Sequence, residues 1–401
     1  MRITFITLKI DIVVGGGANR GLDIKLRSLQ ARGHEVKLLT IFPELNRLPP
    51  EGVPYSVLAE PCKDRGFRAL QKHAVSLLTQ YENQTDVYHI DGTTCMWAGG
   101  MYRKAGGSVP TVVYLPTYAE ALNLLPYEAP DPFKGFMPWL KFHIDVRMVW
   151  FKHWLWAKFV GIKYIHHLDK IFGDSPVLCE NYVRFGFPKD KFEVMPEFVD
   201  ASHFLDKDVQ GSAIPDVFNA ERSFHLLHVG RLLRMKGVDL LIQAVAGLRR
   251  GDRNVTATVL GNGPQLERLQ KLAQKLGVKA AVTFLPWTEE SALAPTYASC
   301  DAFVHPCRFP EPFGRTILEA LFFHRPSVTT EHSGSAWVAG NAGKTIKMNN
   351  AADLERVLAE LYDHPPLLKK LLNAAPERVA FFNHDHWTRV LEQSLQKLIT
   401  R

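Results

Sequence analysis

The sequence predicts an α/β protein made of two domains, each with a parallel β-sheet. Short apolar runs alternate with helical patterns along the whole chain of 401 residues, as expected for repeated βαβ units. A chain of this length is longer than one hydrophobic core usually organises. The alternation is interrupted over residues 198–219 by a polar stretch that carries Gly and Pro and has no clear period. We therefore place the linker between the two domains there.

The strand pattern of the first half begins near the N-terminus. The runs that predict strands are Ile3–Thr7, Glu35–Leu39, Val87–Ile90, Thr111–Leu115, Lys170–Gly173 and Phe192–Val194. The run from Arg20 to Arg32 is amphipathic and is followed by Gly33, which is typical of the end of a helix.

The second half starts the pattern again. Its predicted strands are Phe224–Val229, Thr256–Leu260, Val282–Phe284, Ala302–His305 and Ser327–Thr330. Helical patterns lie between them, and the chain ends in a strongly amphipathic run, Trp387–Leu398, which predicts a last helix.

Charge and hydropathy limit the class of protein. The formal net charge of +7 favours an anionic partner such as a nucleotide, a phospholipid or a nucleic acid. No nucleic-acid reader motif is present, so nucleic acid is not an expected partner. No stretch approaches the roughly 18 consecutive apolar residues that a membrane span needs. The start, MRITFITLKIDIVVGGG, lacks the basic region and cleavage site of a signal peptide. A cytoplasmic location is expected.

The cysteines are scattered and odd in number. They are Cys62, Cys95, Cys179, Cys300 and Cys307. None forms a C-x-x-C pair, which argues against a zinc site or a disulfide framework. Reduced thiols are expected.

Positive charge and tryptophan are concentrated in residues 133–170. This segment holds six Lys and one Arg against two Asp, and four of the eight tryptophans. One interpretation is superficial contact with the cytoplasmic face of a membrane, or a groove for a lipid-linked acceptor, through Trp139, Trp150 and Trp154. The other is a core helix over Val149–Ile165, since apolar residues lie nearly all round it.

The loop after the strand Phe224–Val229 predicts an anion site. It reads Gly230-Arg231-Leu232-Leu233-Arg234-Met235-Lys236-Gly237 and leads into a predicted helix, Val238–Leu248. Free N–H groups and the helix dipole at such a start attract phosphate, and Arg231 and Lys236 add two cations. The alternative is a solvated basic loop. A second glycine turn, Gly261-Asn262-Gly263-Pro264, follows the next strand and by itself indicates close packing as readily as ligand binding.

Two glutamates stand eight residues apart after the strand Ala302–His305. Glu311 precedes a Pro-Phe-Gly turn that opens a predicted helix, and Glu319 lies inside that helix. Eight residues at 100° each return near the starting direction, so both point to a similar side. Carboxylates accept hydrogen bonds from sugar hydroxyls, and Glu319 stands among apolar neighbours, which favours a partnered side chain over an idle one.

Three segments, HVGRLLRMKGVDLLIQAV, LGNGP and EPFGRTILEA, resemble in order and spacing the donor-binding half of family-4 retaining glycosyltransferases, the glycosyl transferases of group 1. The two glutamates match that family's E-x7-E motif. The resemblance covers nearly all of the second half and, more weakly, the first. It implies a GT-B fold with two Rossmann-like domains, residues 1–197 and 198–385, facing each other across a cleft. Residues 386–401 would pack back on the first domain.

The resemblance also implies roles for single residues. The donor-binding set would be Gly16, Gly17, Arg231, Lys236, Gly261, Gly263, Glu311, Phe313, Gly314 and Glu319. Within it, Arg231 and Lys236 would hold the pyrophosphate and Glu311 would contact the hydroxyls of the transferred sugar, which makes these three the catalytic candidates. Glu319 would contact the ribose.

The sequence departs from the family pattern at two places. Pro116 stands where many members carry a histidine near the donor sugar. Gly334-Ser335-Ala336-Trp337-Val338 replaces the usual pair of glycines followed by Glu. Both departures concern the sugar pocket and leave the phosphate site untouched.

The implied activity is the transfer of a hexose from a UDP- or GDP-linked donor to a glycan or lipid-linked acceptor, as in polysaccharide or lipopolysaccharide biosynthesis. No metal or cofactor is expected, because Asp206-Lys207-Asp208 falls in the linker rather than in a loop suited to a metal-bound diphosphate. Two alternatives stay open. One is a nucleotide-sugar epimerase on the same fold, against which the glutamate pair argues. The other is a sugar-nucleotide-binding protein that has lost catalysis, which is suggested by Pro116 in place of the family's histidine.

Overall fold

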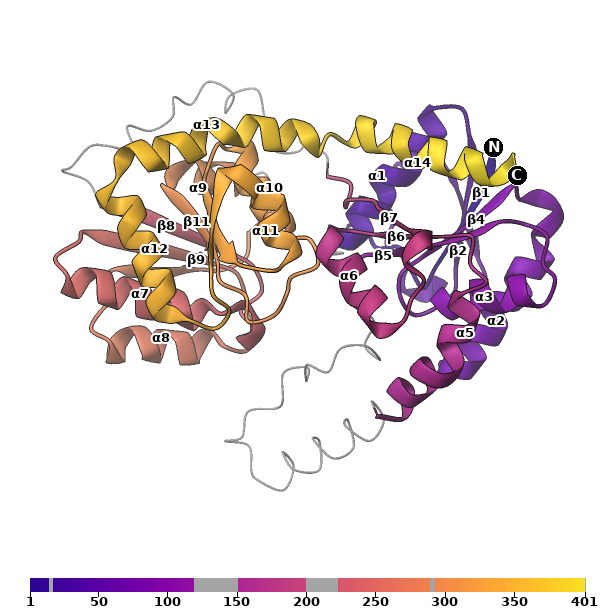
Figure 1. Cartoon of the computed structure of the whole chain (residues 1–401), viewed down its shortest axis with the longest axis horizontal. Helices are drawn as coiled ribbons and strands as arrows, with labels where there is room; N and C mark the ends of the chain where they lie inside the picture. The colour runs from indigo at the N-terminus through magenta and orange to yellow at the C-terminus, as the bar shows by residue number, and fades with distance from the viewer. Residues whose placement is uncertain (14–16, 119–150, 200–222, 289–292, 401) are drawn as a thin grey trace. The chain divides into compact units, whose positions relative to one another are not determined.

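The structure is a computed structural model that describes residues 1–13, 17–118, 151–199, 223–288 and 293–400. The chain forms two compact units (Figure 1). Unit 1 comprises Met1–Val199 and Asn383–Arg401, and unit 2 comprises Asp200–Phe382. The first division falls two residues after the end predicted for the first domain, and the chain returns to unit 1 three residues before residue 386.

Unit 1 is built on a seven-stranded parallel sheet with strand order β3-β2-β1-β4-β5-β6-β7. The strands are β1 Arg2–Thr7, β2 Glu35–Thr40, β3 Ser56–Ala59, β4 Val87–Asp91, β5 Thr111–Leu115, β6 Lys170–Gly173 and β7 Phe192–Val194. The helices are α1 Gly17–Ala31, α2 Phe67–Gln80, α3 Met96–Lys104, a π-helical turn Ala157–Gly161, α5 Ile162–Ile165 and α6 Pro176–Phe185, together with α14 His384–Ile399 from the chain's end.

The central strands are apolar along their length because helices cover both faces of the sheet. Successive residues of a strand point to opposite faces, so Phe5 and Ile6 of β1 enter two different hydrophobic clusters. Phe5 packs in the cluster that includes Leu26 of α1 and Leu391 of α14. Ile6 packs in the cluster that includes Leu77 of α2.

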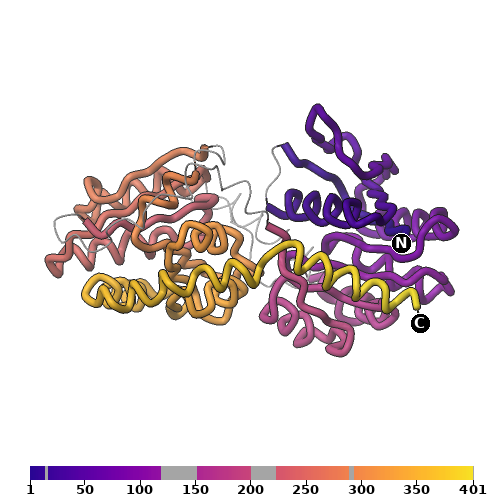
Figure 2. The backbone as a smooth tube through the Cα atoms, turned by 90° about the horizontal axis from the view of Figure 1, so that it is seen from above, coloured from indigo at the N-terminus to yellow at the C-terminus, as the bar shows by residue number. Residues whose placement is uncertain are grey.

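The last helix, α14, is part of unit 1, as Figures 1 and 2 show in yellow. Its residues Leu391 and Leu395 are fully buried in the cluster that holds Phe5 of β1. The carboxylate of Glu392 lies 2.7 Å from Nη2 of Arg32 and 2.9 Å from Nε2 of His34. The apolar stripe of this helix thus completes the core of unit 1.

Unit 2 is built on a six-stranded parallel sheet with strand order β10-β9-β8-β11-β12-β13. The strands are β8 Phe224–Val229, β9 Val255–Leu260, β10 Val282–Leu285, β11 Ala302–His305, β12 Ser327–Thr330 and β13 Gly343–Ile346. The helices are α7 Val238–Arg250, α8 Leu266–Lys275, α9 Leu293–Ser299, α10 Arg315–Phe322, α11 Gly334–Ala339, α12 Ala351–Asp363 and α13 Pro365–Phe381. Its largest hydrophobic cluster joins the strands to residues of α7, α8, α12 and α13.

The predicted α/β class with two parallel sheets is confirmed, and every strand named from the sequence is present within one residue at each end. Two edge strands were not predicted. Ser56–Ala59 is a half-exposed strand of four residues at the edge of the first sheet, and Gly343–Ile346 begins at a glycine at the edge of the second. Edge strands are buried on fewer sides, so they lack the long apolar run that marks a central strand.

The basic aromatic segment has two faces in the part that the structure describes, residues 151–170. Trp156 is half-buried and packs against the core, edge-on to Trp97 with ring centroids 5.3 Å apart. On the outer side Phe151, Phe159 and Val160 are 58%, 61% and 40% exposed. Trp139 and Trp150 lie outside the described residues. The inner face therefore fits the interpretation as a core helix, and the exposed face fits the interpretation as a surface that contacts a membrane.

Among the helices that the structure describes, none has the length and apolarity needed to cross a membrane.

Shortening a buried side chain of α14 should destabilise unit 1. We expect Leu395→Ala to lower the free energy of unfolding by about 2–5 kcal/mol, because the change leaves a cavity in the core. Urea unfolding followed by circular dichroism measures the loss. Gln393→Ala, on the exposed side of the same helix, is the control and should change stability by less than about 0.5 kcal/mol. Equal effects of the two variants would show that α14 does not contribute to the core.

Candidate functional site

The candidate site lies at the carboxyl ends of β8 and β11 in unit 2. These neighbouring strands are the point where the strand order of the sheet reverses, because β9 and β10 lie on one side of β8 and β11 to β13 on the other. In open parallel sheets, ligands bind at the carboxyl edge at such a switch point. The two loops that leave these strands carry the predicted cations and the first glutamate.

The loop after β8 is fastened to the loop after β11 through backbone atoms. Gly237 starts α7 with φ of +68°, and a Cβ built on it would lie 2.0 Å from the carbonyl oxygen of Pro306. Only glycine tolerates both conditions. The N–H of Arg308 donates to the carbonyl of Met235 at 2.8 Å. This contact brings Lys236, which precedes Gly237, beside the loop that carries Glu311.

Lys236 and Glu311 form the central ion pair of the site. Nζ of Lys236 lies 2.6 Å from Oε2 of Glu311, and the two side chains are only 15% and 17% exposed. Burial opposes both charges, but each stabilises the other. The pKa of Glu311 is therefore held well below its usual range despite burial, and the Glu311 carboxylate keeps the pKa of Lys236 above its ordinary value against the same effect. The pair is a fixed cation and a fixed acceptor at the edge of the sheet.

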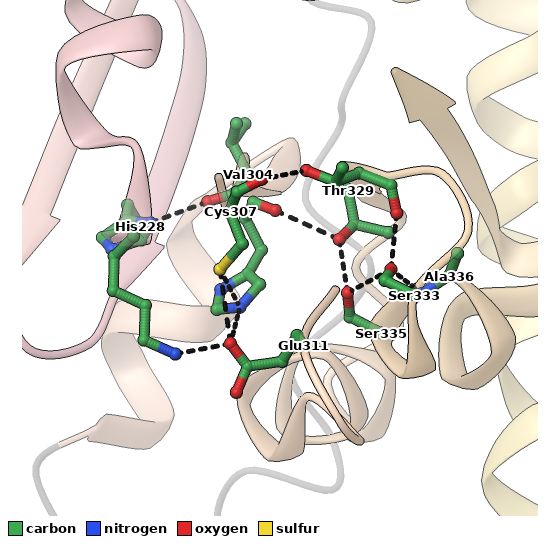
Figure 3. A network of polar contacts seen from close by, with 11 residues as sticks. His228, Val304, Cys307, Glu311, Thr329, Ser333, Ser335 and Ala336 are labelled. Carbon is green, nitrogen blue, oxygen red and sulfur yellow. Dashed lines mark hydrogen bonds and ion pairs between the residues drawn. The ribbon is translucent and has the colours of Figure 1, made fainter. Parts of the chain in front are cut away.

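His305 and Cys307 lie against the same carboxylate oxygen. Nε2 of His305 is 3.5 Å from Oε2 of Glu311, Sγ of Cys307 is 3.3 Å from it, and Sγ and Nε2 are 3.0 Å apart. Figure 3 shows Cys307 and Glu311 pointing toward one another. Burial lowers the pKa of His305 and raises the pKa of Cys307 well above its usual range. At neutral pH the imidazole and the thiol are therefore uncharged.

Hydroxyl groups of β12 hold the backbone on which these side chains stand (Figure 3). Oγ1 of Thr329 donates to the carbonyl of His305 at 3.1 Å, and Oγ1 of Thr330 donates to the carbonyl of Cys307 at 2.6 Å. Ser335 pairs with Thr329 at 2.8 Å. The departure at Gly334-Ser335 thus places a hydroxyl in this network.

The loop after Glu311 folds tightly into α10. Gly314 caps the helix with φ of +94°, and a Cβ on it would meet Cβ of Ser335 at 2.6 Å. Gly334 packs closer still, since its missing Cβ would lie 1.7 Å from the carbonyl oxygen of Pro312. Phe313 is buried and packs edge-on against Phe382 at 5.5 Å. The turn is therefore rigid, and the start of α10 lies next to Glu311 in the chain.

Glu319 is partnered, as its apolar neighbours indicated, and its partners differ from those of Glu311. It is 6% exposed; its Oε2 accepts a hydrogen bond from the hydroxyl of Tyr297 at 2.7 Å, and its Oε1 lies 3.2 Å from Nε of Arg315. Burial and the Glu319 charge raise the pKa of Tyr297 well above its usual range. Glu311 precedes α10 and Glu319 lies within it, and the two carboxylates have different polar partners.

The remaining donor-site candidates of unit 2 lie in the loops after β8 and β9. Arg231 is exposed and directly follows Gly230, the first residue after β8. The glycines of the second turn have a packing role: a Cβ on Gly261 would lie 1.9 Å from the carbonyl oxygen of Gly230, and one on Gly263 would lie 2.4 Å from that of Leu232. Close approach of two loops accounts for both glycines, and donor binding by them stays a prediction.

Only some of the site residues predicted for unit 1 lie within the described residues. Gly17 is the first residue of α1, and Gly16 lies outside the described residues. Trp154 is half-buried and stacks on Phe151 with ring centroids 6.3 Å apart. Pro116 directly follows β5, at the carboxyl edge of the sheet.

Two groups of polar residues at the sheet edges were not predicted from the sequence. One is the pair His305 and Cys307; the signal that points to it is their place at the end of β11, directly before the loop of Glu311. The other group is in unit 1, where the buried Lys25 lies 3.3 Å from Asp91 and 3.4 Å from the ring centre of Tyr114. In an amphipathic helix a lysine looks like a surface residue, so nothing in the sequence distinguished Lys25.

Comparison with known proteins agrees with this architecture. The family model described as glycosyl transferases group 1 matches residues 212–378, and the model described as glycosyltransferase family 4 matches residues 15–203. A D-inositol 3-phosphate glycosyltransferase of Pseudarthrobacter chlorophenolicus is 31% identical over 228 residues, which are 55% of this chain and 53% of that protein. The chain spans about half the length of the curated relatives it matches.

Solved structures resemble the chain over its full length. A lipopolysaccharide outer core galactosyltransferase, WaaB, superposes with a TM-score of 0.73 at 14% identity and 99% coverage of both chains. The Anabaena protein HepE in complex with UDP gives 0.69 at 17% identity, with 99% of this chain and 100% of that one covered. These likenesses show the two-domain GT-B fold.

Removing the negative charge of Glu311 should destabilise the protein in a pH-dependent way. Glu311→Gln leaves the buried Lys236 ammonium unpaired, so we expect a loss of about 3 kcal/mol at pH 7. Because the folded-state pKa of Glu311 is depressed, the wild-type advantage is complete above its ordinary pKa of 4.5 and shrinks as the pH falls below that value. Urea unfolding at pH 7, 5 and about 3.5 measures the difference.

The control for this measurement is Glu360→Gln, which breaks a more exposed ion pair with Lys344 at 3.0 Å. It should cost less than about 1 kcal/mol at any of these pH values. A penalty for Glu311→Gln that stays constant from pH 7 to 3.5 would contradict the depressed pKa.

Proposed function

The chain belongs to the group 1 glycosyltransferases of the family 4 type, and from this premise we propose that it transfers a hexose from a UDP- or GDP-linked donor to a glycan or lipid-linked acceptor. The proposal includes retention of the anomeric configuration and needs no metal ion. The observation that carries it is the buried ion pair between Lys236 and Glu311 at the switch point of unit 2.

The ion pair supplies the two kinds of group that a nucleotide sugar needs. Lys236 presents a fixed ammonium at a site where a diphosphate can approach the start of α7, and a preorganised cation stabilises charge that develops on the leaving phosphate. The exposed Arg231 adds a second cation five residues earlier. Glu311 keeps its carboxylate ionised, so it can accept hydrogen bonds from sugar hydroxyls.

The acceptor side of the proposal rests on unit 1. The outer face of residues 151–160 combines exposed Phe151, Phe159 and Val160 with Lys152. Beside it, a hollow of about 360 Å³ is lined by Gly66, Phe67, Arg68, Lys152, His153 and Trp156. Aromatic side chains with nearby cations suit the interface between lipid tails and anionic headgroups. We propose that this face touches the cytoplasmic surface of a membrane and that the acceptor is lipid-linked, as in lipopolysaccharide assembly.

Loss of the Lys236 cation should suppress transfer. With Lys236→Ala, the release of UDP or GDP from a nucleotide sugar in the presence of acceptor is expected to fall at least about 100-fold, the usual effect of removing one preorganised donor. The measurement is nucleoside diphosphate release across a panel of UDP- and GDP-sugars. Lys275→Ala, which removes the same charge from the exposed end of α8, should keep wild-type activity.

Three outcomes of this assay would count against the proposal. Wild-type turnover in Lys236→Ala would remove the assignment of the site. Tight binding of a nucleotide sugar by the wild-type chain without turnover would indicate a binding protein, the alternative raised by Pro116. Formation of an isomerised nucleotide sugar would indicate an epimerase.

The exposed apolar face should govern membrane attachment. Replacing both Phe159 and Val160 by Ser is expected to reduce cosedimentation with vesicles of anionic phospholipid at least about fivefold, because two exposed apolar side chains that would insert into the bilayer are lost. Met348→Ser changes an apolar residue of unit 2 that is 40% exposed and should leave binding unchanged. Equal binding by wild type and the double variant would refute the membrane contact without affecting the donor site.

A further inference from the structure

Three side chains at the end of β11 form a compact set of metal-ligating atoms. Nε2 of His305, Sγ of Cys307 and Oε2 of Glu311 all lie within 4.8 Å of one another, and each side chain offers one ligand atom. His305 and Cys307 are 3% and 0% exposed, whereas Glu311 reaches the surface at 17%. The set is therefore buried at its base and accessible at the carboxylate.

The separations of these atoms match one face of a tetrahedron around zinc. Zinc bonds of about 2.0–2.3 Å at tetrahedral angles place neighbouring ligand atoms about 3.4–3.6 Å apart. The observed edges are 3.0 Å for sulfur to nitrogen, 3.3 Å for sulfur to oxygen and 3.5 Å for nitrogen to oxygen. The largest adjustment needed is an opening of about 0.6 Å between Cys307 and His305.

We propose that His305, Cys307 and Glu311 bind a zinc ion, with the fourth position open to solvent. A thiolate, an imidazole and a carboxylate are the ligands that zinc prefers, and a softer ligand such as sulfur disfavours Mg²⁺ and Ca²⁺. Binding releases the thiol proton of Cys307 to solvent, because the thiolate is the form that ligates.

The ion must compete with Lys236 for Oε2 of Glu311. The ammonium lies 2.6 Å from the same oxygen that would coordinate the metal, and a metal cation at that oxygen repels the ammonium. The side chain of Lys236 is 15% exposed, so the displaced ammonium can turn toward solvent. Zinc therefore competes with the ion pair for Oε2 of Glu311, and each arrangement weakens the other.

The consequence for activity rests on the proposed function. With zinc bound, Oε2 of Glu311 is ligated and Lys236 leaves the position that the ion pair gives it, so the arrangement proposed to receive a nucleotide sugar is disrupted. The zinc form is then an inhibited form of the enzyme, and transfer recovers when a chelator removes the ion. The absence of a C-x-x-C pair argues against a zinc site of that spacing, but a single cysteine joined by His305 and Glu311 does not follow that spacing.

Cobalt substitution tests the site without any assay of transfer. Co²⁺ bound to a thiolate gives a charge-transfer absorption in the near ultraviolet, and added Zn²⁺ should abolish that band by taking the site. We expect one band-forming Co²⁺ per full-length wild-type chain and no band in Cys307→Ser. Cys62→Ser, which changes a half-buried thiol of unit 1, is the matched control and should keep the band.

Two further variants predict opposite changes in affinity. Lys236→Met removes the competing cation and should tighten Zn²⁺ binding at least about tenfold, measured by displacement of Co²⁺. Glu311→Gln removes a ligand and should weaken it at least about tenfold, since the loss of an outer-shell partner alone often costs that much. Circular dichroism confirms that each variant is folded before titration.

Several results would overturn the zinc site. They are the absence of a band in the wild type, a band that persists in Cys307→Ser, and weaker zinc binding in Lys236→Met. A band with no effect of zinc on transfer would keep the metal site and count against the donor-site role of Lys236 and Glu311. The failure of one proposal is thus distinguishable from the failure of the other.

Discussion

The ion pair between Lys236 and Glu311 is the constraint on which the site of unit 2 depends. Taking a carboxylate and an ammonium out of water is costly, and the cost is offset only when the two meet in good geometry. Here that geometry requires two loops to approach within backbone contact, which Gly237 against Pro306 permits. The hydroxyl of Thr329 then fixes the carbonyl of His305. The backbone of both loops is therefore arranged so that one buried pair of charges can exist.

Unit 1 has a polar group at its own switch point, with the opposite balance of charge. The sheet order reverses between β1 and β4, and Asp91 ends β4 beside the buried Lys25. Tyr114 donates a hydrogen bond to Asp174, whose pKa is raised well above its usual range by burial and by the charge of Glu197. Burial and the nearby charge of Glu197 therefore favour the protonated form of Asp174. Pairing thus accounts for the buried charges of the site in unit 2, whereas in unit 1 the pair of Lys25 and Asp91 lies beside a carboxyl group whose protonated form is favoured by burial.

Features that lie within one short stretch of sequence could be predicted, whereas contacts between distant segments could not. The loop around Lys236 and the turn after Glu311 each lie between a strand and a helix, so their place at the carboxyl edge followed from the order of elements. The contact between them spans 75 residues, and only the sheet order brings β8 beside β11. The same holds for Cys307, whose isolation in the sequence hides its neighbours. Edge strands such as Ser56–Ala59 were missed because burial, which creates the apolar signal, is weakest there.

The two glutamates illustrate how one motif produces two chemical environments. Glu311 stands in a loop against an ammonium, an imidazole and a thiol, all of which act on a single oxygen, Oε2. Glu319 stands in α10, where Tyr297 and Arg315 each take a different oxygen. A carboxylate oxygen has two lone pairs, so Glu319 can still accept a hydroxyl while its partners keep it oriented. Oε1 of Glu311 takes no part in the ion pair. If a sugar is held by the first glutamate and a ribose by the second, the first can bind through Oε1 without giving up Lys236, and the second binds as an acceptor already fixed in place. Metal coordination through Oε2 would disturb this arrangement, because Lys236, the cation proposed to face the diphosphate, then competes with the metal for the carboxylate that positions it.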